Sequence, residues 1–316
     1  MCLGLCFINL TNSQTCCSGG IPLSNNIGLE FSGAQTALMG ISYDFNNLNT
    51  LKNDSETLDD DSRLRTTHSV LINTGYSFSE KLSVEGLFTW VNQRRIISQF
   101  GSENLDQTYG LGDAVVLARY KIINNIKKNW SVNLGFGVKI PVGSSIETND
   151  QGITLNADLQ PGSNAWDLIY LLGTSKTFDF RPTMTFSTRI VYRQPGVNES
   201  YFGNSTYQFG NELQTYLSIS DQFIIKKTLI NPGITIKYRN AVKDQTQGFD
   251  IPNTGGDWVF LIPNFSIQLF QNISFNAAAE LPLYSRPDGI QLTPTYRLTT
   301  GLLFNLFNKP QVVTIN

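Results

Sequence analysis

The chain has 316 residues, of which 41% are hydrophobic and 15% charged, and its 23 basic and 25 acidic residues give a net charge of −2. This balance excludes the strongly basic surface of a nucleic-acid-binding protein, and no run of 18 apolar residues predicts a membrane-spanning helix. One histidine and four cysteines leave little material for a metal centre or a nucleophile, so we expect no cofactor and no enzymatic activity.

The N-terminal residues do not follow the pattern of the rest of the chain. Residues 1–10 are apolar but lack a basic start, and residues 1–15 are interpreted as the remnant of a signal peptide. Residues 16–26 then form a periplasmic segment that begins with Cys16 and Cys17 and is not preceded by a lipoprotein motif. The cysteine pair could be a strained disulfide, a pair of soft-metal ligands or a pair without essential chemistry, and we favour the last.

From residue 28 onward, apolar side chains recur at every second position. The clearest run is Trp130–Ile140, in which aromatic and aliphatic residues alternate with serine, asparagine, glycine and lysine. A period of two places all the apolar side chains on one face of a strand. Twelve such runs are predicted, at residues 28–46, 66–78, 82–96, 109–124, 129–142, 164–178, 182–194, 205–220, 223–241, 257–271, 273–285 and 291–307.

The connections between these runs alternate in length. Short turns are expected at residues 79–81, 125–128, 179–181, 221 and 271–272, and long loops at 47–65, 101–108, 143–163, 197–204 and 242–256. Short turns at one end and long loops at the other are typical of outer-membrane barrels. We therefore expect an all-β protein of the bacterial outer membrane. Residues 27–308 would form a twelve-stranded antiparallel transmembrane β-barrel in contact with membrane lipids, and residues 309–316 a periplasmic tail.

The second face of the predicted strands is small, polar or charged. A charge near the middle of a bilayer costs about 2–4 kcal/mol, so this face should line the lumen of the barrel. Neighbouring charges of opposite sign would form an ion-pair network that stabilises the wall, or they would act as a polar gate that orients a solute. The predicted lumen-facing charged residues are Glu85, Asp113, Arg119, Lys139, Asp167, Arg189, Arg193, Glu212, Lys237, Arg239, Glu280 and Arg297.

The last predicted strand carries a second signal of an outer-membrane barrel. Residues Thr299–Leu306 follow a polar, glycine, aromatic and apolar pattern that is similar to the terminal insertion strands of such barrels. This pattern implies the outer-membrane barrel assembly machinery as a partner, whereas no nucleic acid is expected.

Two further features were weighed as sites. A lipid-hydrolysing barrel needs serine and histidine together on its lipid-facing wall, and His68 falls on that wall with no serine among its predicted neighbours. The acidic residues 53–61 could ligate Ca²⁺, but they lack the glycine and terminal glutamate of a regular calcium loop and are more simply a solvated outer loop.

Three stretches in the middle of the chain carry a family resemblance. They are Gly110–Asp113 with Arg119 and Tyr120, Gly137–Gly143, and Leu159–Ser163 followed by Trp166 and Asp167. In order and spacing they resemble the outer-membrane transporter family named for the MetA pathway of phenol degradation. The resemblance implies uptake of hydrophobic or aromatic compounds.

We therefore expect a channel that passes small solutes through a charged lumen, with a non-transporting scaffold or surface-binding barrel as the alternative. A further hypothesis places residues 16–26 inside the lumen as a plug. Its apolar residues Ile21–Leu23 would then contact Leu87, Val115 and Leu117, which are apolar exceptions on the lumen-facing side of the strands.

Overall fold

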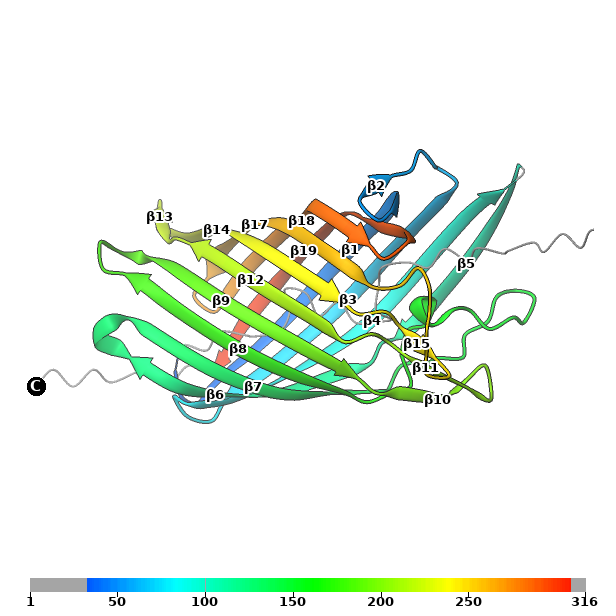
Figure 1. The fold of residues 1–316 in the computed structure, drawn as a ribbon. Coiled ribbons are helices and arrows are strands. Elements are labelled where there is room, and N and C mark those ends of the chain that lie inside the picture. Colours follow the sequence, from blue (N-terminus) through cyan, green and yellow to red (C-terminus); the bar gives the residue numbers. More distant parts are fainter. Residues whose placement is uncertain (1–32, 100, 308–316) are drawn as a thin grey trace, which may run out of the picture.

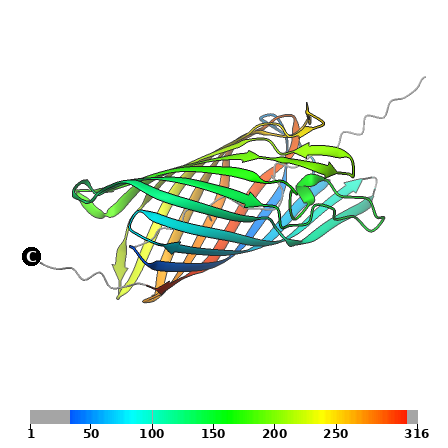
Figure 2. The ribbon, with the colours of Figure 1, turned by 90° about the horizontal axis from the view of Figure 1, so that it is seen from below.

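The computed structural model describes residues 33–99 and 101–307 of the chain. In these residues twelve antiparallel strands form one closed barrel, because β12 pairs with β14 and β1 pairs with β19. Figures 1 and 2 show the strands running obliquely around the barrel. The expected fold class is confirmed. The barrel strands are β1 (Thr36–Asn53), β3 (Arg63–Ser77), β4 (Leu82–Gln99), β6 (Ala114–Asn125), β7 (Trp130–Ile140), β8 (Asp167–Phe178), β9 (Arg181–Pro195), β12 (Glu212–Ser220), β14 (Thr228–Ala241), β17 (Gly256–Phe270), β18 (Ile273–Pro287) and β19 (Ile290–Phe307).

The remaining elements lie beyond the two rims of the barrel. The long-loop end, here called the mouth, carries β2 (Glu56–Thr57), β5 (Ser102–Leu111) and a four-stranded sheet, here called the mouth sheet (Figure 1). The mouth sheet consists of β10 (Val197–Tyr201), β11 (Ser205–Gln208), β15 (Gln245–Thr246) and β16 (Phe249–Asp250). The opposite end, here called the turn end, carries β13 (Phe223–Ile225). Two 3₁₀ turns, η1 (Ile126–Lys128) and η2 (Ala157–Leu159), complete the described elements. Among the described residues no helix is long and apolar enough to cross a membrane.

The alternation on the barrel strands sorts side chains between two environments. On β7, Leu134 and Phe136 are 47% and 52% exposed on the outer face, whereas Lys139 is 1% exposed on the inner one. An exposed apolar outer face is the pattern of a barrel that has lipid as its outer solvent. The same alternation runs through β3 and β12.

Several expected boundaries are wrong, and most of the differences lie at the mouth. Residues 28–32 of the first predicted run lie outside the described residues; within them the first strand spans Thr36–Asn53, so that most of the loop expected at 47–65 is strand. The loop expected at 101–108 is strand β5, which pairs with the outer half of β4. Asp106 and Thr108 of β5 are buried, but Leu105 is the one apolar residue among residues 101–108, so this stretch shows no apolar alternation.

Two other predicted runs are divided in the structure. The run at 205–220 contains β11, which belongs to the mouth sheet, and the barrel strand β12. The turn expected at Asp221 lies instead at Lys226 and Lys227, which link β13 to β14 with φ of 48° and 77°. Asp221 is still hydrogen-bonded within the ladder, because its backbone N–H donates to the carbonyl of Pro232.

Candidate functional site in the barrel lumen

Six charged side chains of alternating sign cross half of the barrel wall near the mouth. Lys139 Nζ lies 3.0 Å from Asp113 Oδ2 and 3.1 Å from Asp167 Oδ2. Arg193 then links Asp167 to Glu212 at 3.9 and 3.6 Å. Arg239 Nε closes the series 2.7 Å from Glu212 Oε1. Lys139 faces Asp167 and Arg193 faces Glu212 directly in the strand register, so pairing of the strands assembles these contacts. These six residues are here called the charge ladder.

The other predicted lumen charges are placed on the same strands or on their neighbours. Glu85 pairs with Arg119 at 3.1 Å, and Lys237 pairs with Glu280 at 3.1 Å. Arg297 pairs with Asp44 at 2.8 Å. Nine of the twelve predicted residues are buried, and the arginines at 189, 239 and 297 are half-buried. A buried pair adds little net stability, but removing one partner costs about 3–5 kcal/mol because the other charge stays buried.

Asp113 also holds the loop between β7 and β8, residues 141–166, which is here called the mouth loop. Its carboxylate accepts hydrogen bonds from the backbone N–H of Gly143 at 3.1 Å and of Ser163 at 3.0 Å. The Ser163 hydroxyl donates to the same carboxylate at 2.9 Å, and Lys139 Nζ also contacts that hydroxyl. One fully buried carboxylate therefore ties both ends of the loop to the charge ladder.

Two glycines permit the ends of the mouth loop to meet. A Cβ on Gly162 would lie 2.5 Å from the carbonyl oxygen of Gly143, and a Cβ on Gly143 would lie 2.7 Å from that of Leu111. No residue with a side chain fits such spacings without a backbone shift. The stretches that carry the family resemblance thus converge on one place, the anchor of the mouth loop.

The middle of the mouth loop is bound by side chains of β4 and β3, which follow β7 and β6 in the order of the sheet. Arg65 Nη1 of β3 donates to Asp158 Oδ2 at 2.8 Å, and this pair is almost fully buried. Gln93 Nε2 of β4 donates to the carbonyls of Leu159 and Gln160, each at 3.2 Å. Charge-assisted and buried hydrogen bonds of this kind fix the loop over the lumen.

The mouth sheet packs on the other side of this loop. Ala157 forms a buried cluster with Tyr207 and Phe209, and the Tyr207 hydroxyl donates to Asp244 Oδ2 at 2.6 Å. Burial raises the pKa of Tyr201 to about 12 and raises that of Tyr207 well above its ordinary value. Burial likewise raises the pKa of Asp244. The mouth is therefore covered by the mouth loop and by an aromatic sheet packed against it.

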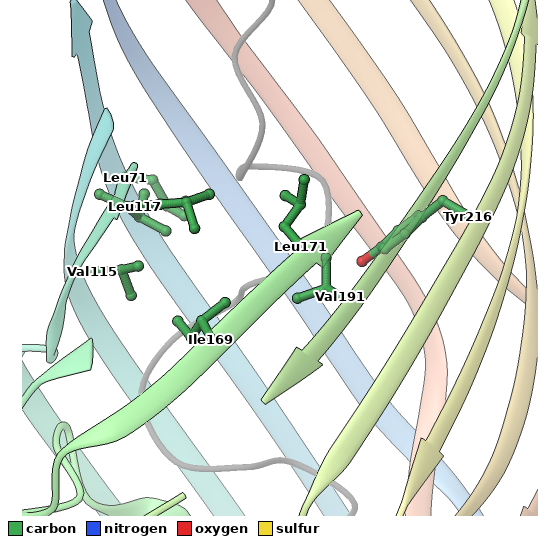
Figure 3. Close-up of a cluster of buried hydrophobic side chains, with 8 residues drawn as sticks. Leu71, Val115, Leu117, Ile169, Leu171, Val191 and Tyr216 are labelled. Atoms are coloured by element: carbon green, nitrogen blue, oxygen red, sulfur yellow. The ribbon is translucent and has the colours of Figure 1, made fainter. Parts of the chain in front are cut away.

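Below the charge ladder the inner wall becomes apolar. Figure 3 shows side chains from strands far apart in the sequence following one another along the inside of the barrel. At this level the inner positions of β7 are Gly135 and Gly137, and Leu117 packs over them. A Cβ added to Gly135 or to Gly137 would lie 3.4 Å or 2.8 Å from Leu117 Cδ1. This apolar cluster consists of Leu71, Leu87, Val115, Leu117, Ile169, Leu171, Val191 and Tyr216, all 4% exposed or less.

Cavities occupy the lumen between the apolar cluster and the turn end. One of about 440 Å³ is lined by small and amide side chains such as Asn73, Thr235 and Asn276. A second, of about 120 Å³, lies beside Leu171 and Tyr216, and Arg189 and Thr235 line both. A third, of about 230 Å³, opens among the turns near Lys81 and Lys121. The lumen is thus organised from mouth to turn end as a covered opening, a charge ladder, an apolar cluster and a vestibule of mixed polar and apolar lining.

Comparison with known proteins supports the family that the converging motifs indicate. Residues 44–283 match the model of the family described as "Putative MetA-pathway of phenol degradation". The chain belongs to this family. No curated protein matches this chain.

Solved structures similar to this MetA-pathway family protein are outer-membrane barrels. An outer membrane channel from Pseudomonas putida F1 is 13% identical, with a TM-score of 0.68 over 90% of this chain and 99% of that one. The beta domain of the Bordetella autotransporter Brka is 10% identical, with a TM-score of 0.50 over 86% of this chain and 99% of that one. At these identities the likeness concerns the fold.

The sequence pattern did not predict some of the residues that face the lumen in this member of the MetA-pathway family. Asp44 shares the inward parity of Gly40 and Ser42, so the alternation alone was enough to find it. Arg65 and Asp158 fell in segments expected to be loops, where parity has no meaning. Two residues of the apolar cluster, Ile169 and Leu171, were missed because β8 is apolar on both faces.

The structure also shows the surroundings of the other two features considered as possible sites, His68 and the acidic loop. His68 Nδ1 lies 2.6 Å from the Tyr43 hydroxyl, and its ring packs 4.9 Å from that of Phe45. In the acidic loop, hydrogen bonding by the Ser62 side chain lowers the pKa of Asp60, and the backbone N–H of Ser62, which donates to Asp60 at 2.8 Å, lowers it further. Within residues 33–99 and 101–307 no group of three or more metal-ligating side chains converges. The hypothetical plug at 16–26 lies outside the described residues.

Proposed function

We propose that this protein is a non-enzymatic channel of the bacterial outer membrane that passes small solutes with an apolar or aromatic part. The observation that carries the proposal is the apolar cluster, whose buried side chains pack against one another inside the barrel between the charge ladder and the vestibule cavities, so that a solute passing between them would meet apolar surface. A pore for hydrated ions has no need of such a surface, because water gains nothing from it. A solute with an apolar part gains about 25 cal/mol for each Å² of apolar surface that it buries there.

The arrangement of the lumen supports passage in a defined order. A solute that passes the mouth loop would meet the charge ladder, then the apolar cluster, and then the vestibule cavities lined by Asn73, Thr235 and Asn276. Polar regions on both sides of an apolar surface keep binding weak enough for release. The description of the family names a pathway of phenol degradation, and phenol is an aromatic compound.

Liposome swelling with the refolded full chain tests the proposal. Phenyl glucoside is larger than glucose and differs from it by an apolar ring, so an open aqueous pore admits glucose faster. We expect the order to be reversed here. Leu117→Ser with Leu171→Ser should restore the order set by size, because both side chains belong to the apolar cluster. Val116→Ser on the outer face is the matched control. Faster entry of glucose into vesicles carrying the unmodified chain, or no swelling with either solute, would contradict the proposal.

A further inference from the structure

One lysine stands on the outer face of the barrel wall close to the turn end. On β8 the outward positions run from Leu168 to Phe178, and Lys176 is the only charged residue among them. The outward positions of β7 and β9, which are both fully described, carry no charge. A charge on a lipid-facing wall is tolerated where it reaches the polar headgroups and is costly at greater depth. Lys176 therefore indicates the level of the headgroups at the turn end.

Aromatic side chains flank this lysine in the strand register. Lys176 faces Trp130 of β7 on one side and Phe186 of β9 on the other, and both rings are exposed. The indole N–H of Trp130 donates to the hydroxyl of Thr174, the next outward position towards the mouth, at 2.9 Å. Aromatic residues gather at the boundary between hydrocarbon and headgroups. Lys176 thus has the surroundings of a side chain that contacts headgroups.

The turn between β6 and β7 brings two more cations to the end of β8. The backbone N–H of Thr177 donates to the carbonyl of Asn129 at 3.0 Å, so this turn lies against the strand that carries Lys176. The turn contains η1, in which Lys127 and Lys128 are both exposed. Among the described residues no carboxylate forms an ion pair with the ammonium group of any of these three lysines. All three are therefore open to an external anion.

Negative charge is scarce around these lysines. The turns on either side of the end of β8, residues 125–129 and 179–180, contain Lys127, Lys128 and Asp179 as their charged residues. Together with Lys176 they place three positive charges against one negative charge. A basic cluster at a membrane surface attracts anionic lipids, and each lysine raises the affinity roughly fivefold.

Exposed apolar side chains lie beside the same cations. Ile126 in the β6–β7 turn and Phe180 in the β8–β9 turn are 77% and 79% exposed, and Leu172 is exposed on the wall towards the mouth. Water is a poor solvent for such side chains, whereas the boundary of hydrocarbon and headgroups accepts them. A ligand that fits this surface therefore has a negative headgroup and an apolar body.

We propose that Lys127, Lys128 and Lys176 form a binding site for an anionic phospholipid on the outer face of the turn end. The lysines bind the phosphate of the headgroup, and the acyl chains lie along the wall beside Trp130 and Leu172. A free phosphate gains nothing from the exposed apolar side chains, so a lipid is the ligand that the whole surface fits. The site lies outside the barrel and does not depend on what passes through the lumen.

Quenching of tryptophan fluorescence by brominated lipids tests the site in vesicles that carry the refolded full chain. Trp130 is the reporter, and its contribution is the difference between the unmodified chain and Trp130→Phe. We expect brominated phosphatidylglycerol to quench Trp130 at a mole fraction about fivefold or more below that needed of brominated phosphatidylcholine. Equal quenching of Trp130 by the two lipids would overturn the proposal without any change of charge.

Double substitutions of equal charge separate a local site from a general attraction. Lys128→Gln with Lys176→Gln should remove most of the preference for phosphatidylglycerol, because two of the three cations are lost. Lys226→Gln with Lys227→Gln is the matched control and should keep the preference. Those exposed lysines link β13 to β14, and β9 and β12 separate that hairpin from β8 in the sheet. Equal loss in the two variants would refute the site.

The composition of the buffer distinguishes a lipid headgroup from a free anion. Phosphate buffer in place of chloride at the same ionic strength should leave the quenching by brominated phosphatidylglycerol unchanged. Displacement of the brominated lipid by inorganic phosphate would show that the lysines bind a free anion, and the lipid site would be refuted.

Discussion

Replacing Asp113 by asparagine should release the mouth loop. The carboxylate is fully buried and accepts donors from Lys139, Gly143 and Ser163. An asparagine keeps one acceptor oxygen but turns an N–H₂ group towards groups that also donate. Loss of one partner of a buried pair costs about 3–5 kcal/mol. We expect a cost at the lower end of this range, because Lys139 still has a second carboxylate partner, Asp167, at 3.1 Å.

We therefore expect the free energy of unfolding to fall by about 3 kcal/mol in urea titrations of the micelle-refolded protein. The freed loop should also be cut beside Leu155 and Leu159, which are now buried, by a protease that cleaves next to leucine. Ion conductance through planar bilayers should rise.

Asp44→Asn is the matched control. Asp44 is similarly buried and pairs with Arg297 at 2.8 Å, but Arg297 and Thr299, which bind its carboxylate, both lie on β19 rather than on the mouth loop. It should lose a similar free energy of unfolding with no new cleavage and no gain in conductance. If the two variants behave alike in cleavage and conductance, Asp113 does not hold the loop and the reasoning fails.

Three further outcomes are expected. Phe136→Arg should lower the yield of folded protein in vesicles far more than Asn276→Arg. Phe136 is 52% exposed on the outer face, where an arginine costs about 2–4 kcal/mol in lipid, whereas Asn276 lines the 440 Å³ cavity. Equal yields would contradict the assigned faces. Epitope tags inserted after Asp59 should be reachable on intact cells and tags after Lys127 should not, and the opposite labelling would reverse the orientation. Ionisation of Tyr201, read at 295 nm as the difference from Tyr201→Phe, should have its midpoint near pH 12. Since folding raises this pKa above 10, the stability it contributes is intact below pH 10 and is lost as the pH rises through about 12; a midpoint near 10 would show that the ring is not buried.

Alternation was enough to predict the barrel because lipid and lumen demand opposite side chains from neighbouring positions. It assigned Phe136 and Lys139 to opposite faces, as the structure has them. It failed for β5, in which Leu105 is the one apolar residue before Tyr109, and for the mouth sheet, whose strands are two to five residues long. At those lengths the period of two cannot be read.

The candidate site was predictable only in part for a related reason. Each charged residue of the charge ladder can be recognised in the sequence because its neighbours on the same face are small. The order of the strands then places Lys139 beside Asp167. The mouth loop gave no such signal, because Arg65 and Asp158 are 93 positions apart and Asp158 lies on a loop, where no strand pairing predicts its partner. Arg189 was predicted as a lumen charge, but its stacking on Tyr216 depends on a register that the sequence does not specify.

The seam between the first and the last strand has a consequence for the kinetics of folding. Asp44 and Arg297, which pair across β1 and β19, stand 253 residues apart in the chain. Closing a flexible loop of that size costs about 5 kcal/mol of chain entropy, against about 2 kcal/mol for a hairpin of ten residues. The eleven hairpin-like pairings between consecutive barrel strands can each form locally, whereas the seam must wait until they have shortened the distance between its two edges. Until then the edges of β1 and β19 expose unpaired backbone groups, which invite pairing with other chains. The slowest and most error-prone step of assembly should therefore be the closure of the ring.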